Sequence, residues 1–231
     1  MAKKTSKRGK GKGTSGDSSS STGVRDVIRG CPWRVVGEIA WVKGGEPVNV
    51  PWESRPERDA AKIMAADARI HRIKHQPFVV HYALNGVLHK YIPDYKVNGI
   101  STPVILEIKE FAEATNDENQ ARFPEIARVL ASEGFDFRVW TENEFRKQPL
   151  LSNSNYVLRF RNYPFEGRLA CDVACLLAAH PCLSASAIRA QLGPAATTDA
   201  LFAIVCFGHI YVDCNQTFGA DPTFSEVPRS G

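Results

Sequence analysis

Three carboxylates and one lysine stand in the chain where folding could bring them together. Glu57 lies near an expected helix start, Asp94 follows Pro93, and Glu107 and Lys109 lie two residues apart in an expected strand. Carboxylate oxygens are the ligands that Mg²⁺ prefers, usually one or two of them together with waters and a substrate phosphate. A divalent cation lowers the pKa of a bound water, and a neighbouring lysine stabilises charge that develops on a phosphate. These residues therefore predict metal-dependent phosphodiester cleavage.

Each of these residues also has an ordinary structural explanation. Glu57 stands three residues after Ser54, so the pair can form a capping box at a helix start. Asp94 can be a turn residue at a strand end, and Glu107 and Lys109 can form a solvated ion pair. The Glu–Lys pair, however, lies inside an otherwise apolar strand that follows the Pro-Asp pair closely. This combination favours the catalytic interpretation of the four residues together.

One helix is expected before the Pro-Asp and Glu-x-Lys motifs and one after them. The first begins with Ser54 as N-cap and Pro56 at an early helical position, and it should fade near Ile70. In this helix Glu57 is placed to complete a second cation position or to orient a metal-bound water. The second helix spans 119–132 and is amphipathic. Its inward side chains are expected to be Phe123, Ile126, Val129 and Leu130.

A hairpin is expected between the two helices. The dipeptide Asn85-Gly86 favours a tight type I′ turn, which would join strands 78–84 and 87–95. Asp94 would then stand at the end of the second of these strands.

Strand 103–109 is expected beside the hairpin. Side chains alternate along a strand, so Glu107 and Lys109 should share one face, and the backbone carbonyl of Ile108 is a further candidate metal ligand. A last strand is expected over 135–141, followed by a short helix. The order of these elements predicts an α/β fold with a mixed β-sheet flanked by helices.

The C-terminal third has a different pattern. Helices are expected over 166–179, 184–192 and 197–206, and a strand over 208–213 enters a hairpin. Three helices followed by a β-wing predict a small winged-helix domain. Its third helix contains no lysine or arginine, so this part should bind DNA poorly by itself and should instead dock a protein. The linker before it carries the better candidates for contact with a phosphate backbone, which are Arg159 and Arg161.

The charge of the chain is unevenly distributed. The 231 residues have a net charge of +4, but six basic residues and no acid lie within the first 12 positions. The remaining 23 basic and 25 acidic residues leave the body at −2. Residues 1–23 lack the apolar content to fold and are expected to be disordered, either as an arm that contacts DNA or as a solubilising tail. The candidate DNA-binding residues of this tail are Lys3, Lys4, Lys7 and Arg8.

Other sequence features exclude alternative classes of protein. No apolar run approaches a membrane span, and the N-terminus has no signal-peptide pattern, so a cytoplasmic protein without a membrane partner is expected. The six cysteines form no CxxC pair, which favours reduced, buried thiols over a zinc site. His71 and His75 have a spacing that zinc ligands use, but no suitably spaced partners accompany them.

Two motifs in order resemble a known family. The residues Pro93-Asp94 and Glu107-Ile108-Lys109 resemble the PD-(D/E)xK nuclease signature, and the segment Trp-Glu-Ser-Arg-Pro-Glu-Arg-Asp at 52–59 resembles the Glu-Ser-x-x-Glu block of the TnsA transposon endonuclease family. The resemblance covers about residues 48–145. It implies a restriction-endonuclease-like domain over 24–160, followed by the winged-helix domain over 161–231. Some family members place glutamine where this chain has Glu107, which brings the chain closer to the general nuclease pattern.

The resemblance also implies a function. The chain would cut the non-transferred strand at transposon ends as part of a heteromeric transposase associated with the nucleoid. Its partners would be double-stranded DNA, a DDE-type transposase and an AAA+ regulator ATPase, and its cofactor would be Mg²⁺, with Mn²⁺ as a substitute. The catalytic residues would be Glu57, Asp94, Glu107 and Lys109. The alternatives are a stand-alone restriction, repair or phage nuclease, and a nonenzymatic scaffold with a decayed nuclease core.

Overall fold

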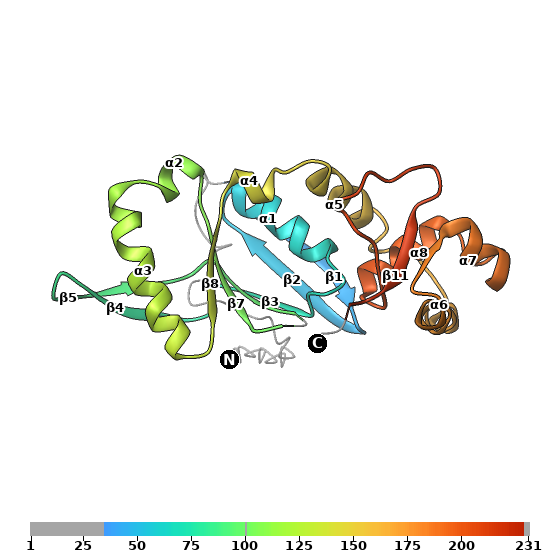
Figure 1. The fold of residues 1–231 in the computed structure, drawn as a ribbon, viewed down its shortest axis with the longest axis horizontal. Helices are drawn as coiled ribbons and strands as arrows, with labels where there is room; N and C mark the ends of the chain where they lie inside the picture. Colours follow the sequence, from blue (N-terminus) through green and yellow to red (C-terminus); the bar gives the residue numbers. More distant parts are fainter. Residues whose placement is uncertain (1–34, 100, 229–231) are drawn as a thin grey trace, which may run out of the picture.

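The computed structural model describes residues 35–99 and 101–228 and has a mixed α/β architecture. The described residues form eight helices and eleven strands, which are arranged in four small sheets (Figure 1). No helix in these ranges is long and apolar enough to cross a membrane. The expected basic tail, with Lys3, Lys4, Lys7 and Arg8, lies outside the described residues.

The first helix begins where the sequence predicted. Helix α1 spans Arg55–Ala66, and the Ser54 hydroxyl oxygen caps it by accepting a hydrogen bond from the Glu57 N–H at 3.2 Å. Pro56 occupies the first turn, where a missing N–H costs nothing. The helix ends four residues before the expected limit at Ile70, because the backbone at Asp67 is extended.

A four-stranded sheet forms the centre of the molecule. Its strands are β3 (Arg72–His75), β6 (Tyr95–Asn98), β7 (Val104–Ile108) and β8 (Asp136–Trp140), in the order β3-β6-β7-β8. The first three strands pair antiparallel, whereas β7 and β8 pair in parallel. Parallel neighbours need a crossover connection, and helix α3 lies within the segment that supplies it. The predicted mixed sheet is therefore confirmed, although β3 was not expected.

Helices cover the central sheet on both faces. One hydrophobic cluster joins Leu106 and Ile108 of β7 to the buried side of α1. The second cluster joins Ile105 to helix α3, which spans Asp117–Ser132, and to the neighbouring hairpin. Successive residues of β7 thus face opposite layers, as strand alternation requires. The four predicted inward residues of α3 all belong to the second cluster, and they are Phe123, Ile126, Val129 and Leu130.

The hairpin differs from its prediction at one end. Strands β4 (Val80–Leu84) and β5 (Val87–Tyr91) pair antiparallel, and both turn residues, Asn85 and Gly86, have positive φ as a type I′ turn requires. The expected strand 87–95 is divided, because β5 ends at Tyr91 and β6 begins at Tyr95 in a different sheet. Proline has no N–H for a ladder, so Pro93 favours this break. Asp94 therefore precedes a strand and does not end one.

The remaining elements connect the sheet to the C-terminal part. Strands β1 (Gly37–Lys43) and β2 (Glu46–Trp52) form a hairpin beside α1. Helices α2 (Phe111–Ala114) and α4 (Glu142–Phe145) are short, and α4 begins with the capping box of Thr141 and Glu144. Helix α5 (Leu150–Leu158), which the sequence did not predict, packs against both α1 and α8.

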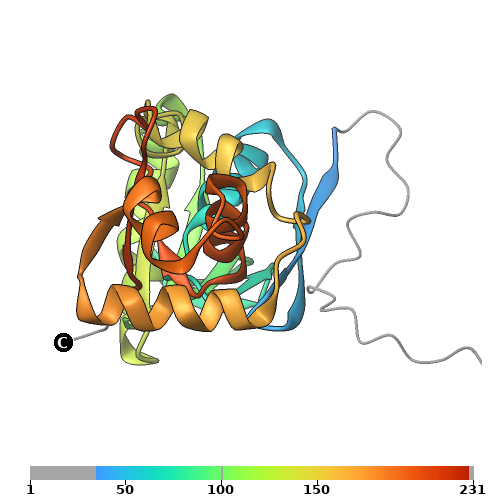
Figure 2. The ribbon, with the colours of Figure 1, turned by 90° about the vertical axis from the view of Figure 1, so that its right-hand side faces the viewer.

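Three helices and a three-stranded antiparallel sheet make up the C-terminal part (Figure 2). In chain order the elements are α6 (Gly167–Ala179), β9 (Cys182–Ser184), α7 (Ala185–Leu192), α8 (Thr198–Phe207), β10 (Ile210–Tyr211) and β11 (Thr223–Glu226). Ser184 and Thr197 cap α7 and α8 with their hydroxyl groups. The sheet order is β10-β11-β9.

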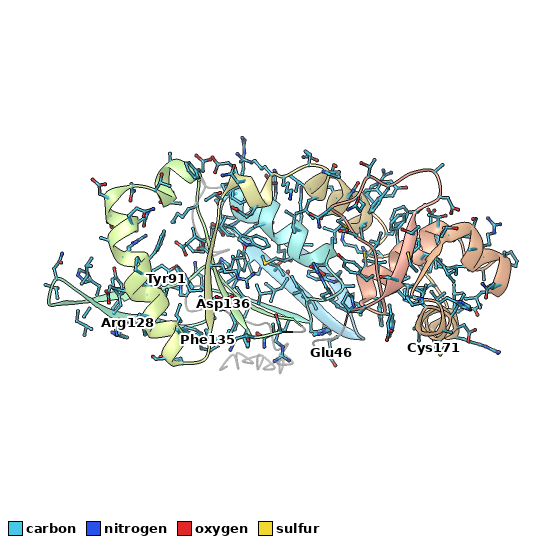
Figure 3. All side chains as sticks on the ribbon, viewed as in Figure 1. Glu46, Tyr91, Arg128, Phe135, Asp136 and Cys171 are labelled. Carbon is cyan, nitrogen blue, oxygen red and sulfur yellow. The ribbon has the colours of Figure 1, made fainter. Side chains whose placement is uncertain are left out.

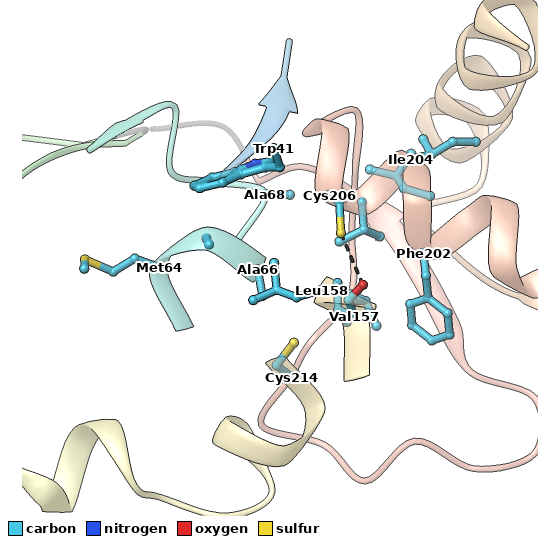
Figure 4. Packing of buried hydrophobic residues seen from close by; sticks show 14 of the residues in the cluster. Trp41, Met64, Ala66, Ala68, Val157, Leu158, Phe202, Ile204, Cys206 and Cys214 are labelled. Atoms are coloured by element: carbon cyan, nitrogen blue, oxygen red, sulfur yellow. Dashed lines mark hydrogen bonds between the residues drawn. The ribbon is translucent and has the colours of Figure 1, made fainter. Parts of the chain in front are cut away.

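The hydrophobic core is continuous between the two parts. One cluster of buried side chains extends from Trp41 in β1 to Phe224 in β11. At its centre the Cys206 thiol donates a hydrogen bond to the Val157 carbonyl at 3.3 Å (Figure 4). Burial raises the pKa of this thiol to about 12, so Cys206 is a protonated core residue, as expected. The expectation of buried thiols is wrong for three other cysteines, which are exposed along α6 and at β9: Cys171, Cys175 and Cys182.

Candidate active site

Glu57 is buried at the start of α1 with both carboxylate oxygens engaged. Its Oε2 accepts a hydrogen bond from the Glu53 N–H at 2.8 Å, and its Oε1 accepts one from the Ser54 hydroxyl at 2.9 Å. His75 of β3 lies beside it, with Nε2 3.7 Å from Oε2, a distance longer than a hydrogen bond. Glu57 therefore helps to close the start of α1, although its carboxylate accepts from the Glu53 N–H and not from the Ser54 N–H that a full capping box requires.

The surroundings of Glu57 favour its ionised form. Burial alone would raise the pKa of this carboxyl, but His75 and the hydrogen bonds from Glu53 and Ser54 outweigh burial and hold the pKa below its ordinary value. Glu57 is consequently a carboxylate at neutral pH, whether or not a cation is bound.

Asp94 is directed at the last residue of β7. Its Oδ2 accepts a hydrogen bond from the Ile108 N–H at 2.7 Å, and its own carbonyl accepts one from the Gln76 N–H at 2.7 Å. The N–H and C=O of one strand residue point toward the same neighbour, so the Ile108 carbonyl is directed to the Asp94 side of β7. The two predicted ligands, the Asp94 carboxylate and the Ile108 carbonyl, are therefore adjacent.

Glu107 is a buried carboxylate held by two partners. The Tyr91 hydroxyl of β5 donates a hydrogen bond to its Oε2, and the Lys109 ammonium lies 3.3 Å from its Oε1. The short Glu107–Lys109 distance confirms that the two side chains lie on one side of β7. Lys109 is also 3.4 Å from Glu113, in α2.

The charges of these groups are coupled. The pKa of Asp94 is raised well above its ordinary value, first by the protein atoms that enclose it, although part of the residue reaches solvent, and then by the negative charges of Glu107 and Glu57. Burial raises the pKa of Glu107 as well, against the lowering effect of Lys109 and Tyr91. Burial lowers the pKa of Lys109, but the neighbouring carboxylates outweigh it, so the pKa of Lys109 is raised. The single positive charge of Lys109 therefore does not fully neutralise the negative charges of Asp94 and Glu107.

This donor set fits a hard divalent cation. Asp94 and Glu107 supply carboxylate oxygens and Ile108 supplies a carbonyl, whereas zinc sites in proteins are built mainly on cysteine and histidine. Among the described residues, no three histidine, cysteine, aspartate or glutamate side chains form a ready-made metal cluster. Glu57 is near enough for its charge to affect Asp94, but the structure does not place it in one shell with Asp94 and Glu107.

The predicted DNA-binding arginines follow helix α5. The Arg161 guanidinium donates a hydrogen bond to the Leu158 carbonyl at 2.8 Å, and the Arg159 guanidinium lies 5.6 Å from the centroid of the Tyr156 ring. Both arginines are therefore held by local contacts at the end of α5.

Sequence reasoning missed a group of residues around the site. Tyr91 holds Glu107, and in Figure 3 it lies beside α3 near the central sheet. Gln76 follows β3 with a φ of 43°, a strained value for glutamine, and donates a hydrogen bond from Nε2 to Glu53 at 2.6 Å. The buried Oε1 of Gln76 has no hydrogen-bond partner among the described residues. His75 was weighed as a zinc ligand on a helix, but it lies in a strand beside Glu57.

Comparisons with known proteins add no relative. No family model matches the chain, and no curated protein matches it. The function must therefore be argued from the residues and their geometry.

Proposed function

We propose that the chain is a Mg²⁺-dependent DNA endonuclease. The supporting observation is that a buried Glu107, an enclosed Asp94 and the Lys109 ammonium converge at the end of β7. Structural ion pairs also occur in proteins, but repelling carboxylates beside a lysine are typical of sites that bind a cation or transfer protons. The motifs resembling the PD-(D/E)xK signature supply the substrate class.

Each residue of the proposed site has its own role in cleavage. When bound by Asp94, Glu107 and the Ile108 carbonyl, Mg²⁺ supplies charge neutralisation at the phosphate and lowers the pKa of a water. Glu107 holds Lys109, whose ammonium donates hydrogen bonds to the attacking water or to a phosphate oxygen. Glu57, ionised beside Asp94, orients water or contributes to a second cation position.

The same motifs support a more specific role. We propose a TnsA-type subunit that cuts the non-transferred strand at transposon ends beside a DDE-type transposase and an AAA+ regulator ATPase. In this proposal residues 24–160 form the restriction-endonuclease-like part. The three helices and antiparallel sheet of 161–231 act as a winged helix that docks a protein. The net charge of −2 outside the first 12 positions supports dependence on partners for DNA binding.

The decisive experiment is cleavage of duplex DNA by the chain and by Asp94→Ala, each assayed alone and in the presence of the partner transposase. Cleavage should require Mg²⁺ or Mn²⁺ and should be lost in Asp94→Ala without loss of folding. Asp172→Ala, a half-exposed aspartate of α6, is the matched control and should keep full activity. If Asp94→Ala cuts as well as the unmodified chain, the assigned site is wrong. Cleavage of naked DNA without a partner would favour the stand-alone nuclease instead.

A further inference from the structure

Positive charge is concentrated in the elements that precede Asp94. No acidic residue stands between Asp67 and Asp94, and this stretch forms β3, β4 and β5. Four of the six histidines also lie there. The lysines and arginines of the stretch are Arg69, Arg72, Lys74 and Lys90. A body that is weakly negative overall therefore has a locally basic region next to its candidate active site.

Lys74 of this region is the cross-strand partner of a second lysine, Lys96, which follows Asp94 by two residues. Lys74 of β3 is directly opposite Lys96 of β6, so their side chains leave the same face of the sheet. Like charges directly opposite each other destabilise a sheet. In the part of the chain that the structure describes, neither lysine has a carboxylate within ion-pair distance, and Lys96 instead lies 4.5 Å from the Phe135 ring centroid. An anion bound between them would relieve the repulsion.

The lysine pair shares its face with Glu107. Lys96 is the partner of Ile105 in β7, and Glu107 is two residues further along the same strand. Neighbouring strands are about 4.8 Å apart, so Lys96 and Lys74 stand one and two strand spacings from β7. Helix α3 covers this face over Ile105, whereas Lys74 on β3 is exposed. A chain of phosphates that reached Glu107 could therefore continue over the two lysines.

The β4–β5 hairpin extends the basic region beyond the sheet (Figure 1). Its register places His81 opposite Lys90 on the solvent face, where Leu88 is 70% exposed. The base of the hairpin is joined to the lysine pair, because Phe78 packs on the Phe135 ring that Lys96 contacts. Lys90, however, leaves the hairpin on the opposite side from Tyr91, whose hydroxyl bonds to Glu107, so Lys90 does not share the face of the lysine pair.

We propose that Lys74 and Lys96 hold the phosphate backbone of duplex DNA on the face of the sheet that carries Glu107. The inference rests on the proposed endonuclease function and says where its substrate lies. Charge complementarity identifies the occupant, since unpaired lysines beside a phosphodiester-cleaving site match a regularly spaced polyanion. The predicted Arg159 and Arg161 are not needed for this contact.

The test is the salt dependence of DNA binding. Binding of the full chain to a fluorescein-labelled 30-base-pair duplex is measured by anisotropy over a series of KCl concentrations, with EDTA present to prevent cleavage. Each of Lys74→Gln and Lys96→Gln should lower the slope of log K against log salt by about 0.9 and weaken binding at 0.1 M salt by roughly eightfold. Lys147→Gln is the matched control, because Lys147 is an exposed lysine outside this surface, and it should change neither value.

The possible outcomes test the proposed DNA-binding surface and the proposed endonuclease activity separately. Unchanged slopes in both variants, with binding by the unmodified chain, would overturn the surface but leave the endonuclease proposal standing. Lowered slopes in a chain that never cleaves DNA would support the surface and contradict the activity. Absence of any DNA binding by the chain alone at low salt would overturn the surface, but not the endonuclease proposal, which allows partners to provide DNA binding. Thermal unfolding checks the folds, and Lys74→Gln should not destabilise, because it removes a repulsion.

Discussion

The Tyr91 hydroxyl donates a hydrogen bond to Glu107 from a different sheet. Tyr91 is the last residue of β5, and Glu107 is in β7, so the bond joins the hairpin to the central strand that carries the site. It fixes one carboxylate oxygen of Glu107 while Lys109 lies against the other. The hairpin therefore positions a candidate metal ligand although it contributes none itself.

Tyr91→Phe should weaken the site without removing a ligand. Loss of a buried hydrogen bond to a charged group should lower the free energy of unfolding by about 1–3 kcal/mol. The cleavage rate at limiting Mg²⁺ should fall by roughly tenfold, equivalent to about 1.4 kcal/mol, and high Mg²⁺ should partly restore it. Cleavage across a Mg²⁺ titration measures this. Tyr82→Phe, another buried tyrosine of the hairpin, is the control. Equal Mg²⁺ dependence in the two variants would argue against positioning.

Lys109→Met should separate chemistry from cation binding. The ammonium contributes to charge stabilisation and is not a ligand, so turnover should fall by about 100-fold or more while binding of Mn²⁺ persists. Single-turnover cleavage and electron paramagnetic resonance of bound Mn²⁺ measure the two properties. A collapse of Mn²⁺ affinity with little effect on the chemical step would mean that the role of Lys109 is misassigned.

Ser54→Ala and Glu57→Gln distinguish capping from catalysis. Removing the N-cap hydroxyl should cost about 1 kcal/mol of stability and leave cleavage by the folded protein largely unchanged. Glu57→Gln keeps the size of the side chain but removes the negative charge, and it should lower cleavage much more than Ser54→Ala does. Urea unfolding and cleavage rates are compared for both. If the two variants differ from the unmodified chain only in stability, Glu57 is a cap residue alone.

Because of Lys43, the free energy of unfolding should change with pH in the alkaline range. Its ammonium is buried and donates a hydrogen bond to the Asp67 carbonyl at 2.6 Å, and burial lowers its pKa from 10.5 to about 8. Between these values the folded protein binds fewer protons than the unfolded chain, so this group makes unfolding less favourable as the pH rises. The gain should total roughly 3 kcal/mol by pH 10.5.

The comparison that isolates this effect is Lys43→Met. Urea unfolding at intervals from pH 7 to 10.5 should show the unmodified chain gaining stability relative to Lys43→Met across that window. Lys147→Met, with an exposed lysine, should follow the unmodified chain. Parallel stability curves for the unmodified chain and Lys43→Met would contradict the assignment.

Local patterns predicted part of the geometry around the candidate site correctly. Strand alternation placed Glu107 and Lys109 together, and cap residues placed Glu57 at the start of α1. The division of strand 87–95 could have been anticipated from Pro93, which lacks an N–H for the sheet. These features depend on residues that are close in sequence.

Features that depend on distant residues could not be predicted. Tyr91 meets Glu107 only because two sheets pack together, and no sequence spacing indicates that contact. Strand β3 is short and basic, so its pairing with β6 is visible only in the fold. Helix α5 mixes apolar residues with serines and asparagines, and its position between α1 and α8 is visible only in the fold.

The shared core around Val157 has a consequence for how the molecule unfolds. Helix α5 belongs to the hydrophobic cluster of both parts of the chain, and Cys206 bonds to its backbone. Separating the two parts of the chain near residue 160 would therefore remove buried apolar contacts from α1 and from α8 at the same time. The two parts should melt in a single cooperative transition, so a partner that binds the C-terminal helices would also stabilise the carboxylates at the far end of the sheet.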